Sequence, residues 1–223
     1  MGNITSDLPK PLIEINNKPI LTYKIENYIN QGFDNITLAL GYKKDKVEKL
    51  IESYPERIKS KVNFSFAGEF VGILDRLYVA LKDYNSPAIV TYGDTITNIN
   101  LNQLYNHHAE SDNKATIVVA SIMNPFGLVE YSNSNKVTIF KEKPLLNYFI
   151  GYFVINCSSI KKLEKKIISL PDGQGIVRAF HHFIKQKKLG SYFYDGEKIT
   201  FNTPSELELA KKKIINFYTS KEV

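Results

Sequence analysis

Asp94 is the residue of this sequence whose position best suits metal binding. It follows an apolar run, Ala88–Tyr92, and a glycine, Gly93. Because the run does not alternate polar and apolar residues, we expect a strand buried on both faces, as in a parallel sheet. Open α/β sheets bind ligands just beyond the carboxyl ends of such strands. A carboxylate there is a candidate ligand for Mg²⁺, which usually accompanies phosphate. The alternative is an aspartate that only opens a turn.

Lys10 is a second candidate, because it stands between Pro9 and Pro11. Each proline ring fixes its own φ near about −65°. A lysine mounted so stiffly suits repeated contact with a phosphate group in one geometry. An exposed lysine in a proline-rich turn explains the same pattern equally well.

Charged residues also close a predicted strand at Phe140–Pro144. Lys141 and Lys143 should lie on one face of that strand and Glu142 on the other. These side chains could contact a ligand, or they could be the ordinary charge pattern of an edge strand. Gly127 precedes another predicted strand, where its backbone could approach a flat ligand closely.

The histidines and the cysteine are weaker candidates for a site. His107-His108 and His181-His182 are adjacent pairs on predicted helices, so the two rings of each pair point in different directions. We therefore expect solvated or core-edge histidines rather than a zinc site. Cys157 is the only cysteine, which excludes an internal disulfide and predicts a small core residue in a reducing compartment.

These candidates need a scaffold, and the first half of the chain predicts one by alternating strands with amphipathic helices. Such alternation is typical of βαβ units in a parallel sheet. Later strands are separated by turn residues, which predicts an antiparallel section. We expect one domain over residues 1–223, with strands at 11–15, 36–40, 62–66, 88–92, 115–122, 128–131, 137–140, 149–155 and 190–194, and helices at 21–29, 47–54, 73–81, 101–108, 158–170, 175–187 and from 203 onward.

Composition excludes several classes of protein. The chain has 223 residues and a net charge of +6, with ordinary globular proportions of hydrophobic and charged residues, 43% and 23%. Its lysines are scattered over predicted helix faces, so we expect a small anionic substrate rather than a nucleic acid. No apolar run reaches the roughly 18 residues of a membrane helix, and no leader opens the chain. We predict a soluble cytoplasmic protein with no membrane partner and leave open a homo-oligomer.

Four motifs, taken together, resemble one family. In chain order they are Leu8–Ile20, Gly41–Lys43, Tyr92–Asn98 and Phe140–Pro144. From residue 2 to about residue 215, the chain is similar to the sugar-1-phosphate nucleotidylyltransferases. The segment Gly68–Leu77, with Phe126-Gly127, is most similar to the glucose-1-phosphate cytidylyltransferase branch.

The resemblance implies the nucleotide-diphospho-sugar transferase fold, a Rossmann-like, three-layer αβα sandwich around a mixed, mostly parallel sheet. It also implies that a sugar 1-phosphate attacks the α-phosphorus of a nucleoside triphosphate, which yields a nucleotide-sugar and pyrophosphate. The product would supply a surface polysaccharide. Positioning and charge neutralisation would carry this reaction.

The resemblance assigns site residues motif by motif. Asp94 would hold Mg²⁺, and Lys10 would neutralise the triphosphate at the attacked phosphorus. Lys143 would hold the sugar phosphate, while Glu142 and Gly127 would contact the sugar. The residues that would bind the nucleotide are Gly2, Asn3, Arg76 and Gly93.

The sequence departs from the family at the nucleotide site. Family members begin with a buried strand and a glycine-rich loop that binds phosphate. Only the tail of that loop is matched here, by Met1–Asn3, with Ile4 in place of a basic residue. By resemblance the absent strand lies between strands 36–40 and 88–92, so we expect a domain truncated at its N-terminus. Further replacements of expected residues are Asn202 for a second metal-binding aspartate, Leu74-Asp75 for a glycine pair, and Ile150-Gly151 for a sugar-binding Asn-Gly pair.

Two other hypotheses stay open. The acceptor could be a non-sugar phosphate, such as phosphocholine or a phosphonate, that receives a cytidylyl group. The chain could also be a non-catalytic descendant that serves as a binding subunit, which the absent loop and Asn202 favour. Pyrophosphate release with different acceptors separates these hypotheses.

Overall fold

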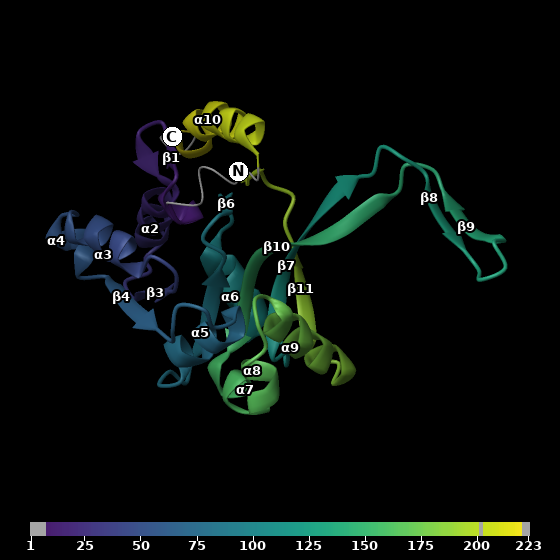
Figure 1. Ribbon diagram of the computed structural model, residues 1–223, viewed down its shortest axis with the longest axis horizontal. Helices are drawn as coiled ribbons and strands as arrows, with labels where there is room; N and C mark the ends of the chain where they lie inside the picture. The colour runs from purple at the N-terminus through teal and green to yellow at the C-terminus, as the bar shows by residue number, and fades with distance from the viewer. Residues whose placement is uncertain (1–7, 201–202, 220–223) are drawn as a thin grey trace.

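The central element of the fold is a four-stranded sheet, flanked by helices and extended on one side by a long hairpin (Figure 1). The computed structural model describes residues 8–200 and 203–219. In this sheet β11 is parallel to β7, whereas β10 is antiparallel to both of its neighbours. Three strands therefore run in one direction, which confirms the mixed, mostly parallel sheet. The strand order is β11 (Leu189–Phe193), β7 (Ala115–Met123), β10 (Leu145–Asn156) and β5 (Pro87–Thr91).

Helices cover both faces of this sheet, as the side chains of β10 show. Phe153 and Ile155 pack into one hydrophobic cluster, and Tyr152 and Val154 pack into another on the opposite face. The first cluster is completed by α5 and α7–α9 and the second by α6, which confirms the three αβα layers (Figure 1). The bounds of these helices are Ile73–Leu81 for α5, Leu101–Ala109 for α6, Cys157–Lys161 for α7, Lys165–Ile168 for α8 and Gln174–Lys185 for α9.

Local sequence explains where two of these helices form. Asn100 caps α6, because its side-chain oxygen accepts a hydrogen bond of 3.0 Å from the backbone N–H of Gln103. In α9, the apolar Ile176, Ala179 and Phe183 recur at helical spacing and are all buried. The amphipathic pattern therefore turns the apolar side of α9 toward the sheet.

One predicted helix, over residues 158–170, is wrong in its extent. The chain forms the two short helices α7 and α8 instead. Glu164 has an extended backbone, with ψ 138°, and so interrupts the helical path between them. Leu163 beside it is buried in the core, so an apolar periodicity continues across a break in the helix.

A second, smaller sheet packs beside the central one. It consists of β3 (Ile36–Leu40) and β4 (Val62–Phe66), which are parallel and are connected through α3 (Lys44–Glu52) and α4 (Glu56–Lys59). Together with α2 (Ile20–Asn30), these helices share one hydrophobic cluster with the two strands. The predicted βαβ arrangement is thus confirmed for this part of the chain.

A cavity of about 690 Å³ separates the smaller sheet from the central one, between β3 and β5. Among the described residues, β3 pairs only with β4, and β5 pairs only with β10. Every residue of β5 is of intermediate exposure. Ala88 and Val90 nevertheless pack against the cluster on one face of the sheet and Ile89 against the cluster on the other, so the prediction that both faces of this strand are covered is confirmed. The exposure arises at one long edge of β5, which faces the cavity instead of another strand.

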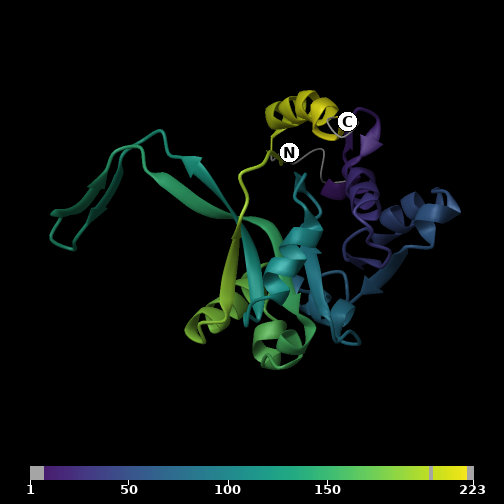
Figure 2. The same ribbon diagram turned by 180° about the vertical axis from the view of Figure 1, so that it is seen from behind.

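The first described residues and the last helix meet at one end of the molecule. Lys10–Leu12 form a 3₁₀ turn, η1, so the predicted extended segment 11–15 is only partly right. Side chains from this region, from β6 and β12, and from α10 share one hydrophobic cluster, and Figure 2 shows α10 next to the N-terminal hairpin. The bounds of these elements are Glu14–Ile15 for β1, Lys18–Pro19 for β2, Ile96–Thr97 for β6, Lys198–Ile199 for β12 and Pro204–Thr219 for α10.

Residues 122–146 form a projecting hairpin, which we call the arm. It contains the antiparallel pair β8 (Leu128–Tyr131) and β9 (Val137–Lys141), together with the ends of β7 and β10. Figures 1 and 2 show that the arm points away from the body. Half of the exposed large apolar side chains in the described ranges belong to the arm. The predicted antiparallel section is therefore confirmed.

None of the helices in the described parts of the chain is both long and apolar enough to cross a membrane.

Candidate active site

Lys10 and Asp94 lie together, although they are 84 residues apart in the sequence. The Nζ atom of Lys10 is 3.5 Å from Oδ2 of Asp94. Asp94 occupies the turn that follows β5, at the carboxyl end of that strand, as the sequence predicts. The two side chains are 36% and 33% exposed, so a ligand that enters from solvent can reach both charges.

Gly93 allows the turn that carries Lys10 to pack closely against the end of β5. A Cβ atom at Gly93 would stand 2.6 Å from Cγ of Pro11, in the turn that carries Lys10. Any side chain at position 93 would therefore push η1 away from β5. Within η1 the backbone N–H of Leu12 donates to the carbonyl oxygen of Pro9 at 2.9 Å, and the two prolines restrict the backbone further. This turn gives Lys10 the stiff mount that the sequence predicts.

A buried lysine supports the loop behind Asp94. Lys24, in α2, is 3% exposed, and its Nζ donates hydrogen bonds to the carbonyl oxygen of Thr95 and, at 2.8 Å, to the hydroxyl of Tyr152. That hydroxyl in turn donates to the same carbonyl oxygen at 3.0 Å. The ammonium also lies 4.7 Å from the centroid of the Tyr152 ring, a cation–π distance. The residue after Asp94 is therefore held by two donors.

Sequence analysis missed Lys24 and Tyr152, because neither belongs to a recognisable motif. The signal that could have found Lys24 is its spacing. Leu21, Lys24, Ile25 and Tyr28 follow one another at helical intervals, so the lysine falls on the apolar face of α2. A lysine on such a face needs buried acceptors, and Thr95 and Tyr152 provide them.

Tyr92 links the Asp94 loop to the neighbouring strand, β10. Its backbone N–H donates to the carbonyl oxygen of Gly151 at 2.9 Å. Gly151 has a φ of +83°, and a Cβ there would stand 3.2 Å from the Tyr92 side chain, so this glycine has a structural role at an irregularity of the sheet. Burial, and then the charge of Asp94, raises the pKa of the Tyr92 hydroxyl.

Arg76 lies at the carboxyl end of β3. A Cβ atom at Gly41, the residue after that strand, would collide with its guanidinium. Nη2 donates to the carbonyl oxygen of Glu69 at 3.1 Å, while Nε is buried and has no hydrogen-bond partner in the described ranges. Arg76 and Gly93 line the same cavity, so two residues expected at the nucleotide border one space. Leu74, which stands where a glycine was expected, is fully buried in the core.

The residues expected to bind the sugar phosphate belong to the arm. A Cβ atom at Gly127 would stand 3.2 Å from the Phe140 ring and 3.5 Å from Oε2 of Glu142, so these residues face one another across the arm. β9 ends at Lys141, and Lys143 has a φ of +41°. The predicted alternation of residues 141–143 across a strand is wrong, because the chain leaves extended geometry before Lys143.

The structure thus gathers the candidate residues in two places. Lys10, Gly93 and Asp94 lie together after β5. Gly127 and Glu142 lie together on the arm, with Lys143 next in the chain. Both views of the molecule show the arm projecting away from the body (Figures 1 and 2), so this conformation does not bring the sugar candidates to Asp94.

Among the weaker candidates, His108 and Cys157 are buried, whereas His107 and His181 are exposed. The Nδ1 atom of His108 lies 2.8 Å from the hydroxyl of Thr116, its Nε2 lies 3.1 Å from Oδ1 of Asn156, and burial lowers its pKa. Cys157 is buried, which raises the pKa of its thiol. Within residues 8–200 and 203–219, no three His, Cys, Asp or Glu side chains gather where they could hold a metal ion.

Comparison with known proteins decides the family. A sequence model of the family described as Nucleotidyl transferase matches residues 1–221, nearly the whole chain. The chain belongs to the nucleotidyl transferase family. The resemblance seen in the four motifs is confirmed at this level, while the cytidylyltransferase branch stays a prediction.

This nucleotidyl transferase has relatives among sugar-phosphate enzymes. It is 29% identical to the mannose-1-phosphate guanyltransferase of Pichia angusta over 238 residues, which cover 97% of this chain but only 64% of that protein. The structure of HddC from Yersinia pseudotuberculosis complexed with GMP-PN matches with a TM-score of 0.69 at 21% identity, over 93% of this chain and 91% of that one. For UDP-glucose pyrophosphorylase complexed with UDP-glucose, the TM-score is 0.68 at 15% identity, with 96% and 92% covered. These structures show the shared nucleotide-diphospho-sugar transferase fold.

Two residues of this nucleotidyl transferase that are predicted to bind the nucleotide, Gly2 and Asn3, lie outside the described residues. The same holds for Ile4 and Asn202, which replace residues expected in the family. The strand before position 202 is nevertheless placed. Ile199, in β12, pairs with Ile96, in β6, two residues after Asp94. The strand β12 therefore lies beside the segment that follows Asp94.

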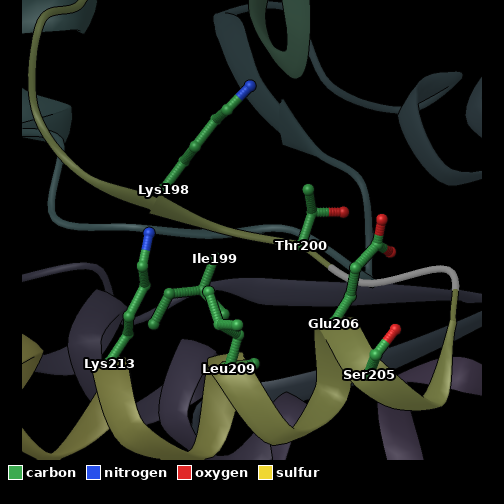
Figure 3. A pocket seen from close by; sticks show the side chains of 8 residues that line it. Lys198, Ile199, Thr200, Ser205, Glu206, Leu209 and Lys213 are labelled. Atoms are coloured by element: carbon green, nitrogen blue, oxygen red, sulfur yellow. The ribbon is translucent and has the colours of Figure 1, made fainter.

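A smaller hollow of about 190 Å³ lies between β12 and α10 (Figure 3). Glu206, from the first turn of α10, and Lys198, from β12, are among its lining residues. The ammonium of Lys198 stacks 3.6 Å from the centroid of the Tyr148 ring. None of the predicted site residues of the nucleotidyl transferase lines this hollow, so we assign it no part in the candidate site.

Proposed function

We propose that this chain transfers a nucleotidyl group from a nucleoside triphosphate to a sugar 1-phosphate. A phosphate oxygen of the sugar 1-phosphate forms a bond to the α-phosphorus, the bond from that phosphorus to the α,β-bridging oxygen breaks, and pyrophosphate leaves. The observation that carries the proposal is the pair of Lys10 and Asp94, 3.5 Å apart beyond the carboxyl end of β5, where sheets of this class bind ligands. Membership of the family and the sugar-phosphate relatives support it.

Lys10 is assigned to the triphosphate. Its ammonium stands at the Asp94 carboxylate on a turn that Pro11 packs against Gly93, so its position is set before a ligand arrives. A positive charge in a fixed place offsets the negative charge that a phosphoryl group carries during transfer. Such positioning, rather than covalent chemistry, is what this reaction requires of the protein.

Asp94 is assigned to Mg²⁺. Protein sites for this ion use one or two carboxylates and leave the remaining positions to phosphate oxygens and water. The chain fits that pattern, because Asp94 offers one partly exposed carboxylate beyond the carboxyl end of β5. When bound, the ion would neutralise phosphate charge and orient the phosphates. Lys24 and Tyr152 fix the residue that follows Asp94 and so limit the movement of its backbone.

The nucleotide is assigned to Gly93 and Arg76, which border the same cavity, and to Gly2 and Asn3 on the strength of the resemblance alone. The acceptor is assigned to Gly127, Glu142 and Lys143. Because the arm projects from the body, a productive complex requires it to approach Asp94, or requires an arm from a second copy of the chain. A homo-oligomer is therefore one of the two arrangements that the proposal includes. We place the reaction in the cytoplasm, where nucleoside triphosphates are made.

The test is pyrophosphate release from a panel of substrates, with Mg²⁺ and with a chelator. GTP with mannose 1-phosphate comes first, because the curated relatives bear that name. CTP with glucose 1-phosphate follows, because the motifs resemble the cytidylyltransferase branch. UTP and dTTP complete the nucleotides, and phosphocholine represents the non-sugar acceptors. Mg²⁺-dependent release with a sugar 1-phosphate alone supports the proposal, whereas release with phosphocholine alone replaces it.

A non-catalytic binding subunit is the second candidate, and one observation favours it. The groups assigned to the acceptor stand on the arm, apart from Lys10 and Asp94 (Figure 1). Isothermal titration with each nucleotide separates the two functions. A chain that binds nucleotide with micromolar affinity but releases no pyrophosphate with any acceptor is a binding subunit.

A further inference from the structure

The four strands of the central sheet share one end that lies away from the candidate site. Their registers pair Asn156 of β10 with Pro87 of β5, and Ala115 of β7 with residues of both β10 and β11. The segments that precede β5, β7 and β11 therefore meet the segment that follows β10. Asp94 follows the opposite end of β5, a strand of five residues, so the length of that strand, about 17 Å, separates it from this shared end.

Lysines from all four segments gather at the shared end, although they are scattered along the sequence. We call it the basic end and define it as residues 82–86, 110–114, 157–162 and 185–188. It contains seven lysines and three carboxylates. The resulting surplus of four positive charges is most of the net charge of the chain, +6. The fold therefore concentrates on one surface a charge that the sequence distributes over more than a hundred residues.

Hydrogen bonds join the four segments of the basic end. The Nζ atom of Lys161, after β10, donates to Oδ1 of Asn85, before β5, at 3.2 Å. The backbone N–H of Lys114, before β7, donates to the carbonyl oxygen of Lys188, before β11, at 2.8 Å. Figure 1 shows α7 and the end of α9 at the same side of the body. The lysines thus belong to one surface and not to independent loops.

Most of the positive charge at the basic end is available to a partner. Among the described residues, Lys188 alone of the seven lysines lies within ion-pair distance of a carboxylate, that of Asp112. Lys82, Lys162 and Lys185 are exposed and come from three different segments. An anion that approaches this end therefore meets unneutralised ammonium groups across the whole surface.

A lipid surface fits this arrangement better than a nucleic acid does. Nucleic acids are bound by an element that enters a groove, or by aromatic rings that stack on the bases. The basic end contains one aromatic residue, Tyr84, whose hydroxyl already accepts a hydrogen bond of 3.4 Å from Asn35. Anionic headgroups require only lysines spread over a broad face. Ile184, which is 56% exposed beside Lys185, adds an apolar side chain that can enter the headgroup region.

We propose that the basic end binds the surface of an anionic membrane. Its lysines contact lipid phosphates, and such peripheral binding needs no membrane-spanning helix. Because Asp94 and the base of the arm lie at the other end of the sheet, the candidate site stays open to solvent in the bound state. The inference does not depend on the proposed transfer reaction. It replaces the expectation of no membrane partner, which treated the lysines as scattered.

The experiment measures binding of the whole chain to lipid vesicles by co-sedimentation. One set of vesicles is pure phosphatidylcholine, and the other contains about 30% of the anionic lipid phosphatidylglycerol. Each lysine near an anionic surface strengthens binding roughly fivefold. At about 0.15 M salt, we expect the partition coefficient for the anionic vesicles to exceed that for the neutral ones at least about a hundredfold. About 1 M salt, which reduces the screening length to about 3 Å, should abolish the difference.

Two triple variants locate the binding surface. The first combines Lys82→Gln, Lys162→Gln and Lys185→Gln, and should bind the anionic vesicles roughly a hundredfold more weakly than the unchanged chain. The second removes the same charge from exposed positions elsewhere, and should lose less than about threefold because distant charges are screened. Its substitutions are Lys49→Gln, Lys136→Gln and Lys212→Gln. Thermal unfolding shows that both variants fold, since all six side chains are exposed.

Equal binding to neutral and anionic vesicles would overturn the proposal. An equal loss in the two triple variants would overturn it as well, because attraction would then come from net charge and not from the basic end. Duplex DNA is titrated at the same salt concentration as a competing polyanion. Tighter binding to DNA than to the anionic vesicles, lost in the first variant alone, would assign the basic end to a nucleic acid instead.

Discussion

The two groups of candidate residues differ in how the protein holds them. Lys10 and Asp94 stand on short turns that are fixed from behind, by the contact of Pro11 with Gly93 and by the buried Lys24. The groups of the arm stand on a two-stranded hairpin whose apolar side chains are largely exposed. If both groups serve the proposed reaction, one half of the candidate site is therefore organised before a ligand binds, and the other half depends on movement of the arm or on a second chain. Changes near Asp94 should act on the rate of transfer, and changes in the arm should act on acceptor affinity.

The largest effect expected is that of Asp94→Asn. Loss of the carboxylate removes the assigned metal ligand, so Mg²⁺-dependent pyrophosphate release should fall by roughly 10³-fold. Circular dichroism should be unchanged, because Asp94 is partly exposed. Asp83→Asn, at an exposed position, is the matched control. Near-normal turnover in Asp94→Asn would remove Asp94 from the proposed mechanism.

Gly93→Ala should have the next largest effect, because the new methyl group would stand 2.6 Å from Cγ of Pro11. The turn that carries Lys10 must then shift, and a displacement of about 1 Å costs roughly 10²-fold in rate. Steady-state assays of pyrophosphate release measure this loss. Pro11→Gly in the same protein removes the clash and should restore part of the activity; if it restores none, the glycine acts in some other way.

Lys143→Ala tests the arm and should raise KM for the sugar 1-phosphate about tenfold, the value of a lost charged hydrogen bond. KM for the nucleotide should be unchanged. Lys141→Ala, at the end of β9, removes a neighbouring charge and serves as the control. An increase confined to the nucleotide KM would mean that the arm does not bind the acceptor, and the contrast between the two groups would be lost.

The smallest effect concerns stability. Tyr152→Phe removes a hydroxyl that accepts from Lys24 and donates to Thr95, and it leaves the buried ammonium with fewer partners. Denaturant titration should show a loss of about 1–3 kcal/mol in unfolding free energy. Tyr131→Phe on the arm, where the ring is 71% exposed, should change stability little. Equal effects of the two substitutions would show that the Asp94 loop is no better supported than the arm.

Local patterns in the sequence predicted the strands of the sheets and the positions of Asp94 and Lys10. Apolar runs ending in Gly or Pro located the strands, and Asp94 lies beyond the carboxyl end of its strand as expected. The stiffness of Lys10 followed from two prolines. Each of these features is decided by residues next to one another in the chain.

Other features depend on distant parts of the chain, and the sequence did not reveal them. Glu164 breaks a helix whose apolar spacing continues across it. Lys24 is buried because Thr95 and Tyr152 supply acceptors, and both are remote in sequence. The position of Glu142 relative to Asp94 depends on the direction of a whole hairpin, which no short motif encodes. The cavity beside β5 likewise exists because β3 and β5 do not pair with each other in the described chain. The residues of β5 alone do not encode this.

The separation of the two sheets also affects how the protein unfolds. In the described chain, β3 and β4 bond to each other but form no backbone ladder with β5, so side-chain contacts attach them there, among them the hydrogen bond from Asn35 to the Tyr84 hydroxyl. Regions of this kind open as independent cooperative units at lower free energy than a continuous sheet. We expect β3, β4 and the helices between them to unfold locally and refold while β7 and β10 remain paired. The boundary at which this local unfolding begins is the one that passes Arg76 and Gly93.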